Sequence, residues 1–294
     1  MLTHYTATPA DPARVVVLGA RGFVGAALVA ALEAAGTPIL ALGSADLDLT
    51  VEGAGTALAD RLRPDDAVVF LSALTPDKGR DIGSYMANQR IGAAVAGAVE
   101  KVAPAHLVYI SSDAVYPMTE GLVSEGSPAD CIDLYGVMHR SRELMMAASC
   151  RAPLAVLRPT LIYGAADTHN SYGPNRLRRA ALKDGRITLF GEGEETRDHI
   201  AVDDVVALIL QVLRHRSAGL LNLATGRSVS YRALAEKVVA LFDTPVEVVG
   251  TPRQNPVTHR HFDVTAVRRA FPDFVFTPLD EGLAKAHRAM MAGL

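Results

Sequence analysis

Hydrophobic positions in the first half of the chain fall into two alternating patterns. Short uninterrupted apolar runs, which are typical of strands buried on both faces of a parallel sheet, lie at residues 14–20, 38–43, 66–74, 105–113 and 154–160. Segments with apolar residues at helical spacing separate these runs, at residues 22–36, 56–64, 84–102 and 133–149. The alternation predicts βαβ units, and with them an α/β fold built on a Rossmann-type doubly wound parallel sheet.

After about residue 160 the pattern changes to loops rich in Gly, Asn and Arg, with shorter elements between them. Strands are expected at residues 187–191, 220–224 and 246–250, and helices at residues 202–216, 231–242 and from Asp280 onward. We therefore divide the chain into a dinucleotide-binding domain, residues 1–160, and a smaller C-terminal α/β substrate-binding lobe, residues 161–294. Exchange of chain segments between the two parts is expected.

Composition and charge exclude several classes of protein. Of the 294 residues 49% are hydrophobic and 21% charged, as in folded globular proteins. The net charge of −3 gives no electrostatic case for nucleic acid or a membrane surface as partner, and the apolar runs are too short to span a bilayer. Cys131 and Cys150 are too few for a disulfide framework or a zinc site. The first residues lack the pattern of a secretion signal, so we expect a cytoplasmic protein without a metal site.

The sequence GARGFVG, residues 19–25, stands between the first expected strand and the helix after it. Its three glycines, Gly19, Gly22 and Gly25, permit a sharp turn and the close approach of a pyrophosphate to the helix N-terminus. A strand, a glycine loop and a helix in this order predict a dinucleotide site.

Charges near this loop bear on the choice between NAD and NADP. An acidic residue at the end of the second strand would hold the ribose 2′-hydroxyl of NAD, but here the first acid, Asp46, comes a few residues late. Arg21 lies inside the glycine loop, where a guanidinium could bind a 2′-phosphate. We therefore expect NADP or NAD as cofactor, with NADP slightly favoured.

Three further motifs follow in order: YISSDAVYP at residues 109–117, LYGVMH at 134–139 and LFGEGEETRDHIAVDDV at 189–205. With the glycine loop they resemble the extended short-chain dehydrogenase/reductases of the NAD-dependent epimerase/dehydratase family. Within that family the resemblance is to enzymes that modify nucleotide-activated sugars, and it covers nearly the whole chain. It implies hydride transfer at C4 of the sugar, as in a 4-keto-sugar reductase or a 4-epimerase.

The resemblance also implies the catalytic groups. Ser112, with Ser111 beside it, matches the hydroxyl that hydrogen-bonds the reacting sugar oxygen, and Tyr135 matches the proton donor or acceptor. The family's lysine, which lowers the tyrosine pKa and holds the nicotinamide ribose, is replaced by His139, so the motif reads YxxxH and not YxxxK. Because histidine is charged only when protonated, with a reference pKa of about 6.5, we expect Tyr135 to be less activated.

Asp113 follows the catalytic hydroxyl, and it is either a fourth catalytic residue or a turn residue at the end of the strand. The resembling 4,6-dehydratases carry Asp-Glu at this place, whereas this chain has Asp113-Ala114. Since one carboxylate of the acid/base pair is absent from the motif, dehydration is less expected than keto-reduction or epimerisation.

The resemblance further implies cofactor contacts along the ends of the strands. Asp48 and Leu49 match the adenine site, Asn88 matches an asparagine that steadies the strand ends, and Arg158-Pro159 matches a segment under the nicotinamide. Outside the glycine loop, packing is an equal alternative for each of these except Asp48. The complete set comprises Gly19, Arg21, Gly22, Phe23, Val24, Gly25, Asp48, Leu49, Leu71, Ser72, Ala73, Asn88, Ser111, Tyr135, His139, Arg158 and Pro159.

A nucleotide-activated sugar carries a diphosphate, which suits arginine side chains and amide donors. The candidate substrate-binding residues in the C-terminal lobe are Asn175, Arg176, Arg197 and Arg253. Two other functions stay open. One is a dehydrogenase of a hydroxylated small molecule without a nucleotide; the other is a catalytically impaired NAD(P)-binding sensor, for which His139 is the main evidence.

Family members often form dimers through two long helices, which correspond here to residues 84–102 and 134–149. The alanine-rich faces of these segments suit a four-helix bundle, so we expect a homodimer.

Overall fold

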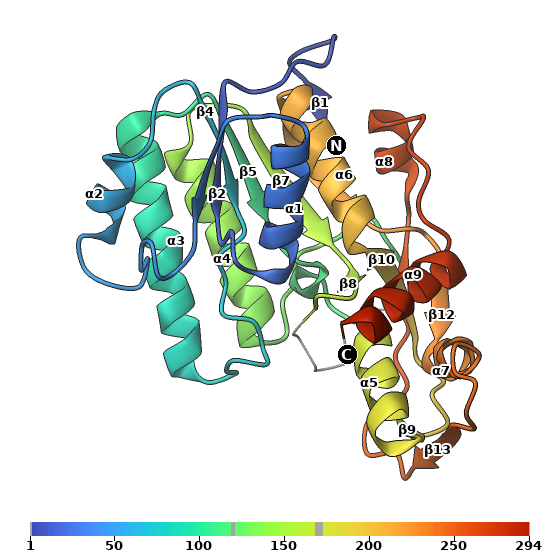
Figure 1. Cartoon of the computed structure of the whole chain (residues 1–294). Coiled ribbons are helices and arrows are strands. Elements are labelled where there is room, and N and C mark those ends of the chain that lie inside the picture. Colours follow the sequence, from blue (N-terminus) through green and yellow to red (C-terminus); the bar gives the residue numbers. More distant parts are fainter. Residues whose placement is uncertain (1, 119–120, 168–172, 294) are drawn as a thin grey trace.

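A seven-stranded sheet with the order β1-β11-β7-β5-β4-β2-β3 forms the larger part of this computed structural model, which describes residues 2–118, 121–167 and 173–293 (Figure 1). Every neighbouring pair is parallel except β1 with β11. The strands are β1 (Thr3–His4), β2 (Arg14–Leu18), β3 (Ile39–Leu42), β4 (Asp66–Phe70), β5 (His106–Ile110), β7 (Leu154–Pro159) and β11 (Ser217–Leu223). The predicted α/β fold with a doubly wound parallel sheet is confirmed.

Helices cover both faces of this sheet, which explains why the strands are apolar at consecutive positions. On one face Val15 and Val17 pack with residues of α1 (Phe23–Ala34) and α6 (Val202–Arg214). On the other face Val16 and Leu18 pack with residues of α2, α3 and α4. These three helices span Ala54–Ala59, Ile82–Val102 and Leu134–Ser149. Among the described residues, none of the helices is both long enough and apolar enough to cross a bilayer.

The smaller lobe lies below and to the right of the sheet in Figure 1 and has its own apolar core. It contains the parallel pair β9 (Arg186–Phe190) and β13 (Glu247–Thr251), and a three-stranded sheet of β8 (Leu161–Tyr163), β10 (Thr196–Ala201) and β12 (Ser228–Ser230). Its helices are α5 (Pro174–Asp184), α7 (Tyr231–Val239) and α9 (Leu279–Ala292). Shorter elements are η1 (Asp113–Val115), β6 (Leu122–Val123), β14 (His261–Phe262) and α8 (Thr265–Ala270).

The chain crosses between the two parts more than once. After β10 it returns to the large sheet as α6 and β11, and β11 pairs in parallel with β7. The division of the chain at residue 160, with exchange of segments between the two parts, stays a prediction.

Helix α2 differs most from its expected bounds. The segment 56–64 was expected to be helical throughout, but α2 spans Ala54–Ala59. After Ala59 the chain forms a tighter turn. The Arg61 N–H donates to the Leu58 carbonyl, and the Leu62 N–H donates to the carbonyls of both Leu58 and Ala59. This short turn ends the helix ahead of Pro64 and buries Leu62 in the core.

Two long helices, α3 and α4, pack side by side on one face of the sheet. They carry apolar side chains that are exposed in the single chain, among them Met86 on α3 and Val137 and Leu144 on α4. A homodimer through these helices stays a prediction.

Candidate active site

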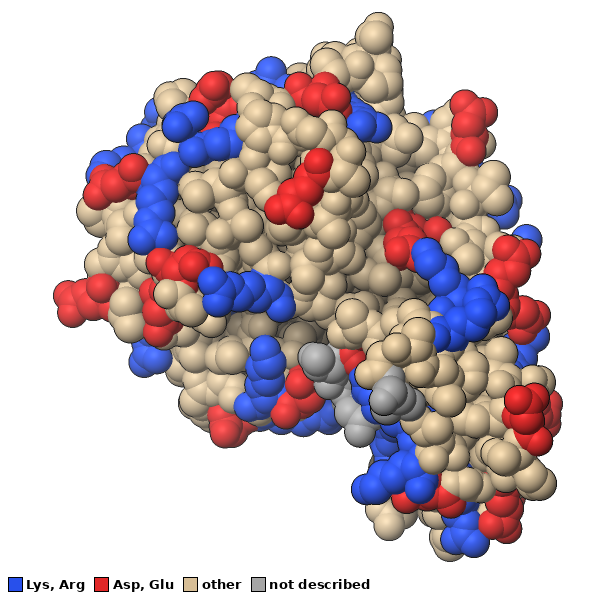
Figure 2. Space-filling view, viewed as in Figure 1, with Lys and Arg blue, Asp and Glu red and all other residues tan. Residues whose placement is uncertain are grey.

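The candidate site lies where parallel strands end at one edge of the sheet. The glycine loop follows β2, residues 71–74 follow β4, and residues 111–113 follow β5. Because these strands are neighbours and point the same way, the three loops meet at their carboxyl ends, where open α/β sheets bind ligands. Figure 2 shows an indentation between this part and the smaller lobe, with Lys and Arg side chains on the lobe beside it.

The glycine loop is built so closely that its glycines have no room for a side chain. Gly19 has φ +93°, and a Cβ there would lie 2.8 Å from the backbone N of Ser72. A Cβ on Gly25 would lie 2.1 Å from the carbonyl oxygen of Gly19. Gly22 is the N-cap of α1 and offers no side chain to cap it, so the first N–H groups of the helix can face an anion. This cradle fits the pyrophosphate of a dinucleotide.

Gly25→Ala is expected to weaken NADPH and NADH binding and to lower the free energy of unfolding by about 1–3 kcal/mol, because the new methyl group overlaps the Gly19 carbonyl. Cofactor fluorescence titration and urea unfolding measure the two effects. Gly97→Ala is the matched control, since it lies in α3 with no atom within 4 Å of the added Cβ. The control should be neutral or slightly stabilising. Equal behaviour of the two variants would contradict this account of the loop.

Arg21 and Asp46 form an ion pair beside the glycine loop, with Arg21 Nη2 donating to Asp46 Oδ1 at 3.0 Å. The second carboxylate oxygen accepts from the Gly43 N–H at 2.9 Å, at the end of β3. The aliphatic part of Arg21 lies over Gly43, where a Cβ would meet its Cγ and Cδ at 3.0 Å. A cation and a carboxylate therefore stand together at the place where the two cofactors differ.

Asn88, on α3, holds the loop that follows β4. Its side-chain amide accepts from the N–H of Leu74 and donates to the carbonyl of Leu74, each at 2.9 Å. This bridging fixes the backbone next to Leu71, Ser72 and Ala73, which are half-buried at the end of the strand. The position suits a residue that steadies the strand ends, while its contact with a cofactor stays a prediction.

Asp48 and Leu49 differ in what they could contact. The Asp48 carboxylate is exposed and accepts from the backbone and the hydroxyl of Thr50, which hold its pKa below the usual range. Leu49 is 7% exposed and packs in the core with residues of α2 and α3. For the side chain of Leu49, the structure therefore supports packing in the core as the alternative to cofactor contact.

Ser111 and Ser112 are oriented differently at the end of β5. Ser111 Oγ donates to Glu143 Oε1 at 2.7 Å inside the protein, so its hydroxyl is committed to α4. Ser112 Oγ accepts from the N–H of Ala114 at 3.1 Å and caps η1. In that arrangement the Ser112 hydroxyl can still donate its proton to another oxygen, which is what the predicted role requires.

Asp113 is held by Arg260, a residue that the sequence motifs did not reveal. Arg260 Nη1 lies 3.1 Å from Asp113 Oδ2, and the same guanidinium donates to the carbonyls of Asp113, Tyr116 and Pro117. Burial raises the pKa of Asp113, and the charges of Arg260 and Arg197 oppose that rise. The carboxylate is thus partly neutralised by a partner 147 positions further along the chain.

Tyr135 and His139 lie at the start of α4, which Asp133 caps by accepting from the Gly136 N–H. Gly136 lets the helix approach η1 closely, since a Cβ there would lie 2.3 Å from the Ala114 carbonyl oxygen. The two rings meet edge to face with centroids 4.7 Å apart. The first turn of α4, which carries Tyr135, therefore packs against η1, the turn that follows Ser112.

His139 is buried, and its two ring nitrogens differ in their surroundings. Nδ1 lies 2.8 Å from the hydroxyl of Tyr109, on β5, whereas Nε2 has no hydrogen-bond partner among the described residues. Burial and the charge of Arg142 keep the pKa of His139 well below its ordinary value, so the ring is neutral at physiological pH. Nε2 is thus a buried polar atom without a partner among the described residues, which leaves it available to a bound ligand.

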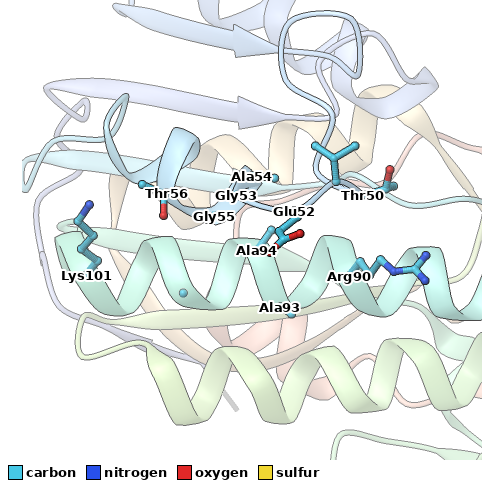
Figure 3. Close-up of a pocket in the computed structure, with 12 residues that line it drawn as sticks. Thr50, Glu52, Gly53, Ala54, Gly55, Thr56, Arg90, Ala93, Ala94 and Lys101 are labelled. Atoms are coloured by element: carbon cyan, nitrogen blue, oxygen red, sulfur yellow. The ribbon is translucent and has the colours of Figure 1, made fainter.

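The phenol of Tyr135 borders a cavity of about 430 Å³ between the loop after β4 and the N-terminal turns of α3 and α4. Burial raises the pKa of Tyr135 above its ordinary value, and the charge of Arg142 offsets part of that rise. A second cavity, of about 520 Å³, lies between residues 50–56 and α3 (Figure 3). None of the predicted site residues lines that second cavity.

Arg158 and Glu143 form a buried ion pair beneath the site. Arg158 Nε and Nη2 donate to the two oxygens of Glu143 at 2.7 and 2.6 Å, and the guanidinium stacks on the ring of Tyr116 at 4.8 Å. Pro159 is buried at the end of the same strand, β7. The guanidinium of Arg158 is therefore occupied within the protein, and this geometry supports the packing alternative for it.

The four candidate substrate residues do not share one environment. Arg197 donates to the carbonyl and hydroxyl of Thr258 and influences the pKa of Asp113, whereas Arg253 forms ion pairs with Glu194 and Glu195. Asn175 is buried in α5 and bonds Asp167 and Arg178, and Arg176 is half-buried on the same helix. Arg197 is thus the candidate whose charge acts on a predicted catalytic residue. Among the described residues, no cluster of side chains could hold a metal ion.

Comparison with known proteins adds a family and a set of similar structures. The model of the NAD dependent epimerase/dehydratase family matches residues 15–224. The structure of MoeE5 in complex with UDP-glucose and NAD is 25% identical over 97% of this chain and 99% of that one, with a TM-score of 0.81. A GDP-L-fucose synthetase from Naegleria fowleri has 16% identity over 98% of this chain and 97% of that one, with a TM-score of 0.86. A UDP-glucose 4-epimerase from Thermus thermophilus, in complex with NAD, has 18% identity over 96% of this chain and 100% of that one, with a TM-score of 0.81. The last two likenesses show a shared fold.

Proposed function

The chain belongs to the NAD dependent epimerase/dehydratase family, and from that premise we propose that it transfers hydride at C4 of a nucleotide-activated sugar. It would act as a 4-keto-sugar reductase or a 4-epimerase. The observation that carries this proposal is the position of Tyr135, which lines a cavity together with Asn88 and the loop after β4 and directly precedes Gly136, where α4 packs against η1. The similarity to MoeE5, which binds UDP-glucose and NAD, supports a substrate of this class.

Each catalytic candidate has a defined task in this reaction. A nicotinamide cofactor bound at the glycine loop would supply the hydride exchange. Ser112 would donate a hydrogen bond to the oxygen on C4, and Tyr135 would give that oxygen a proton during reduction or remove one during oxidation. Reduction therefore needs the protonated phenol and is favoured below the pKa of Tyr135, whereas oxidation needs the phenolate and is favoured above it. The unpaired Nε2–H of His139 would hold the cofactor ribose.

The state of Asp113 bears on the type of reaction. Elimination of water needs a proton acceptor and a proton donor, yet the position after Asp113 is Ala114, and the Asp113 carboxylate is paired with Arg260. Hydride transfer with one proton exchange needs fewer acid/base groups, because Ser112 and Tyr135 are sufficient. This supports reduction or epimerisation over dehydration, and Asp113 is proposed to orient the substrate or the loop.

The cofactor is NAD or NADP, and we propose NADP because Arg21 stands beside the glycine loop with much of its side chain exposed. Arg21→Ala is expected to lower NADPH affinity by about tenfold or more and to leave NADH affinity nearly unchanged, because charge-assisted hydrogen bonds to a phosphate are lost. Fluorescence titration with both reduced cofactors measures this. The charge-matched control is Arg151→Ala. Arg151 is exposed and precedes β7, at the amino ends of the strands and away from the glycine loop. Equal losses for both cofactors would instead favour NAD with Asp46 as its ribose acceptor.

A panel of nucleotide sugars tests the function directly. Purified protein is incubated with NADPH or NADH and with UDP-, dTDP-, GDP- and CDP-sugars and their 4-keto forms, and cofactor absorbance and products are followed. A reductase changes the cofactor in proportion to product, whereas a 4-epimerase inverts C4 with no net change. Cofactor binding without turnover of any panel member would favour the impaired sensor.

A substrate without a nucleotide is the second candidate, and the pairing of Arg253 favours it. Two carboxylates, Glu194 and Glu195, neutralise that arginine, so less positive charge is left for a diphosphate. Hydroxylated sugar acids and lactones are therefore included in the panel. Turnover of these together with failure of every nucleotide sugar would establish this alternative.

A further inference from the structure

Arg142, on α4, is a buried cation whose hydrogen-bond partners are neutral. Its side chain is 0% exposed, and its guanidinium donates to the Ser72 carbonyl at 2.8 Å and to the Asn88 carbonyl and side-chain oxygen at 3.0 Å each. It also packs over the ring of Phe70 at 5.1 Å. Within the described part of the chain, no carboxylate forms an ion pair with it. Burial lowers the pKa of Arg142 from its ordinary value, but a guanidinium keeps its proton at physiological pH, and its charge is screened little by solvent in the interior.

The neighbours that feel this charge are the groups of the predicted proton-transfer site. Arg142 comes seven residues after Tyr135 and three after His139, so the three side chains share one face of α4. Its charge acts on the pKa of both residues and on that of Tyr109, with which it also interacts by a hydrogen bond. Tyr109 in turn contacts Nδ1 of His139.

His139 is placed to perform a different task. Its Nδ1 is engaged by the Tyr109 hydroxyl, and the remaining Nε2 is buried without a partner in the described part of the chain. Because Arg142 also hydrogen-bonds Tyr109, we assign the Tyr109 hydroxyl as donor to Nδ1, which puts the proton of the neutral ring on Nε2. Nε2–H can then donate one hydrogen bond to a bound ligand, but the neutral ring brings no positive charge to the phenol.

We propose that two residues of α4 divide the work that one lysine performs in this family. Arg142 supplies the fixed positive charge that favours the phenolate of Tyr135, and His139 supplies the hydrogen bond to the cofactor. Arg142 is thereby a positioning residue, since it acts through Tyr135 and does not touch the substrate. The inference rests on the proposed function, because it assigns Tyr135 the proton exchange.

Several carboxylates around the phenol oppose its ionisation, so a positive charge is needed to favour the phenolate of Tyr135. Asp113 from η1, Asp133 at the helix N-cap and Asp77 from the loop after β4 each disfavour the phenolate, and burial acts in the same direction. Arg260 offsets part of the Asp113 charge through its ion pair. After burial, the charge of Arg142 is the largest influence on the pKa of Tyr135, and it acts toward ionisation.

The test is a near-ultraviolet titration of the phenol in the protein saturated with the oxidised cofactor. The chain has no Trp and 8 Tyr, so tyrosinate absorbance is not obscured by indole, and subtracting the Tyr135→Phe spectrum isolates one phenol. Arg142→Gln removes the charge but keeps amide donors for the Asn88 and Ser72 carbonyls, and Arg142→Lys keeps the charge. The midpoint should rise by about one to three pH units in the Gln variant and stay near the wild-type value in the Lys variant.

His139→Gln is the second variant, and it keeps the test decisive if Arg142→Gln does not fold. The proposal expects cofactor affinity to fall by about tenfold in His139→Gln while the Tyr135 midpoint stays within about half a pH unit of wild type. Three outcomes overturn it: a midpoint unaffected by Arg142→Gln, a midpoint that rises in His139→Gln, or a wild-type phenol that stays protonated up to about pH 11. A protein that binds neither cofactor refutes the proposed function, whereas bound cofactor with an unshifted midpoint refutes this inference alone.

Discussion

Tyr135→Phe is expected to lower turnover by about 10²–10⁴-fold with little effect on cofactor affinity, because it removes the proposed proton donor and keeps the ring. The edge-to-face packing on His139, with centroids 4.7 Å apart, involves the ring and not the hydroxyl. Stability should therefore change little. Initial rates on the panel substrate that the wild type converts, together with cofactor titration, measure the two quantities.

Tyr116→Phe provides the matched control for the loss of a phenol hydroxyl. Tyr116 is buried, and its hydroxyl donates to Asn222 Oδ1 at 2.8 Å, within the protein. Its removal is expected to reduce the free energy of unfolding by about 1–2 kcal/mol without a comparable fall in turnover. Tyr135→Phe with near-normal turnover would show that another group exchanges the proton, and the enzymatic role of the opening turn of α4 would have to be abandoned.

Arg158→Met is expected to lower the free energy of unfolding by about 3–5 kcal/mol, because it leaves the Glu143 carboxylate buried without its main partner. Burial alone would raise the pKa of Glu143, yet the hydrogen bonds and charge of Arg158 hold it below its ordinary value. Ser111 and the half-exposed Arg140 remain as partners and compensate in part. Urea unfolding at neutral pH measures the loss.

The double variant Arg158→Met/Glu143→Met distinguishes the loss of the ion-pair attraction from the cost of leaving the Glu143 carboxylate buried without a partner. If the cost arises from the uncompensated carboxylate, removing it should restore most of the stability, because an apolar pair of similar volume is often neutral. The native pair also stabilises the folded state above the ordinary pKa of Glu143, and that contribution should fall as the pH drops through the lowered pKa. A single variant that loses less than about 1 kcal/mol would refute this role of the pair.

The larger sheet could be predicted from the sequence because its signal is local. A strand covered on both faces is apolar at consecutive positions, and Val15 to Leu18 show that pattern with every side chain fully buried. The glycine loop is equally local, since the requirement for Gly19 and Gly25 comes from atoms within the loop and from the adjacent end of β4. Helix ends were harder, as the shortened α2 shows.

The charged residues that complete the site could not be predicted in the same way. Arg142 and Arg260 belong to no motif, and their roles depend on acceptors that folding brings to them, 70 positions away at Ser72 and 147 positions away at Asp113. The motif identified the position of His139, but its neutrality depends on burial and on the nearby guanidinium. Arg253 was expected to bind a diphosphate, whereas its pairing with Glu194 and Glu195 follows from the fold of the smaller lobe.

The attachment of Arg260 has a mechanical consequence. Its backbone N–H bonds the Thr196 carbonyl at the start of β10, while its side chain fastens the turn of residues 113–117 at the edge of the large sheet. Moving residue 260 away from that turn would remove four acceptors from a buried guanidinium, which is energetically costly. Arg260 therefore couples β10 to the turn beside Ser112, and its bonds oppose the separation of these two segments.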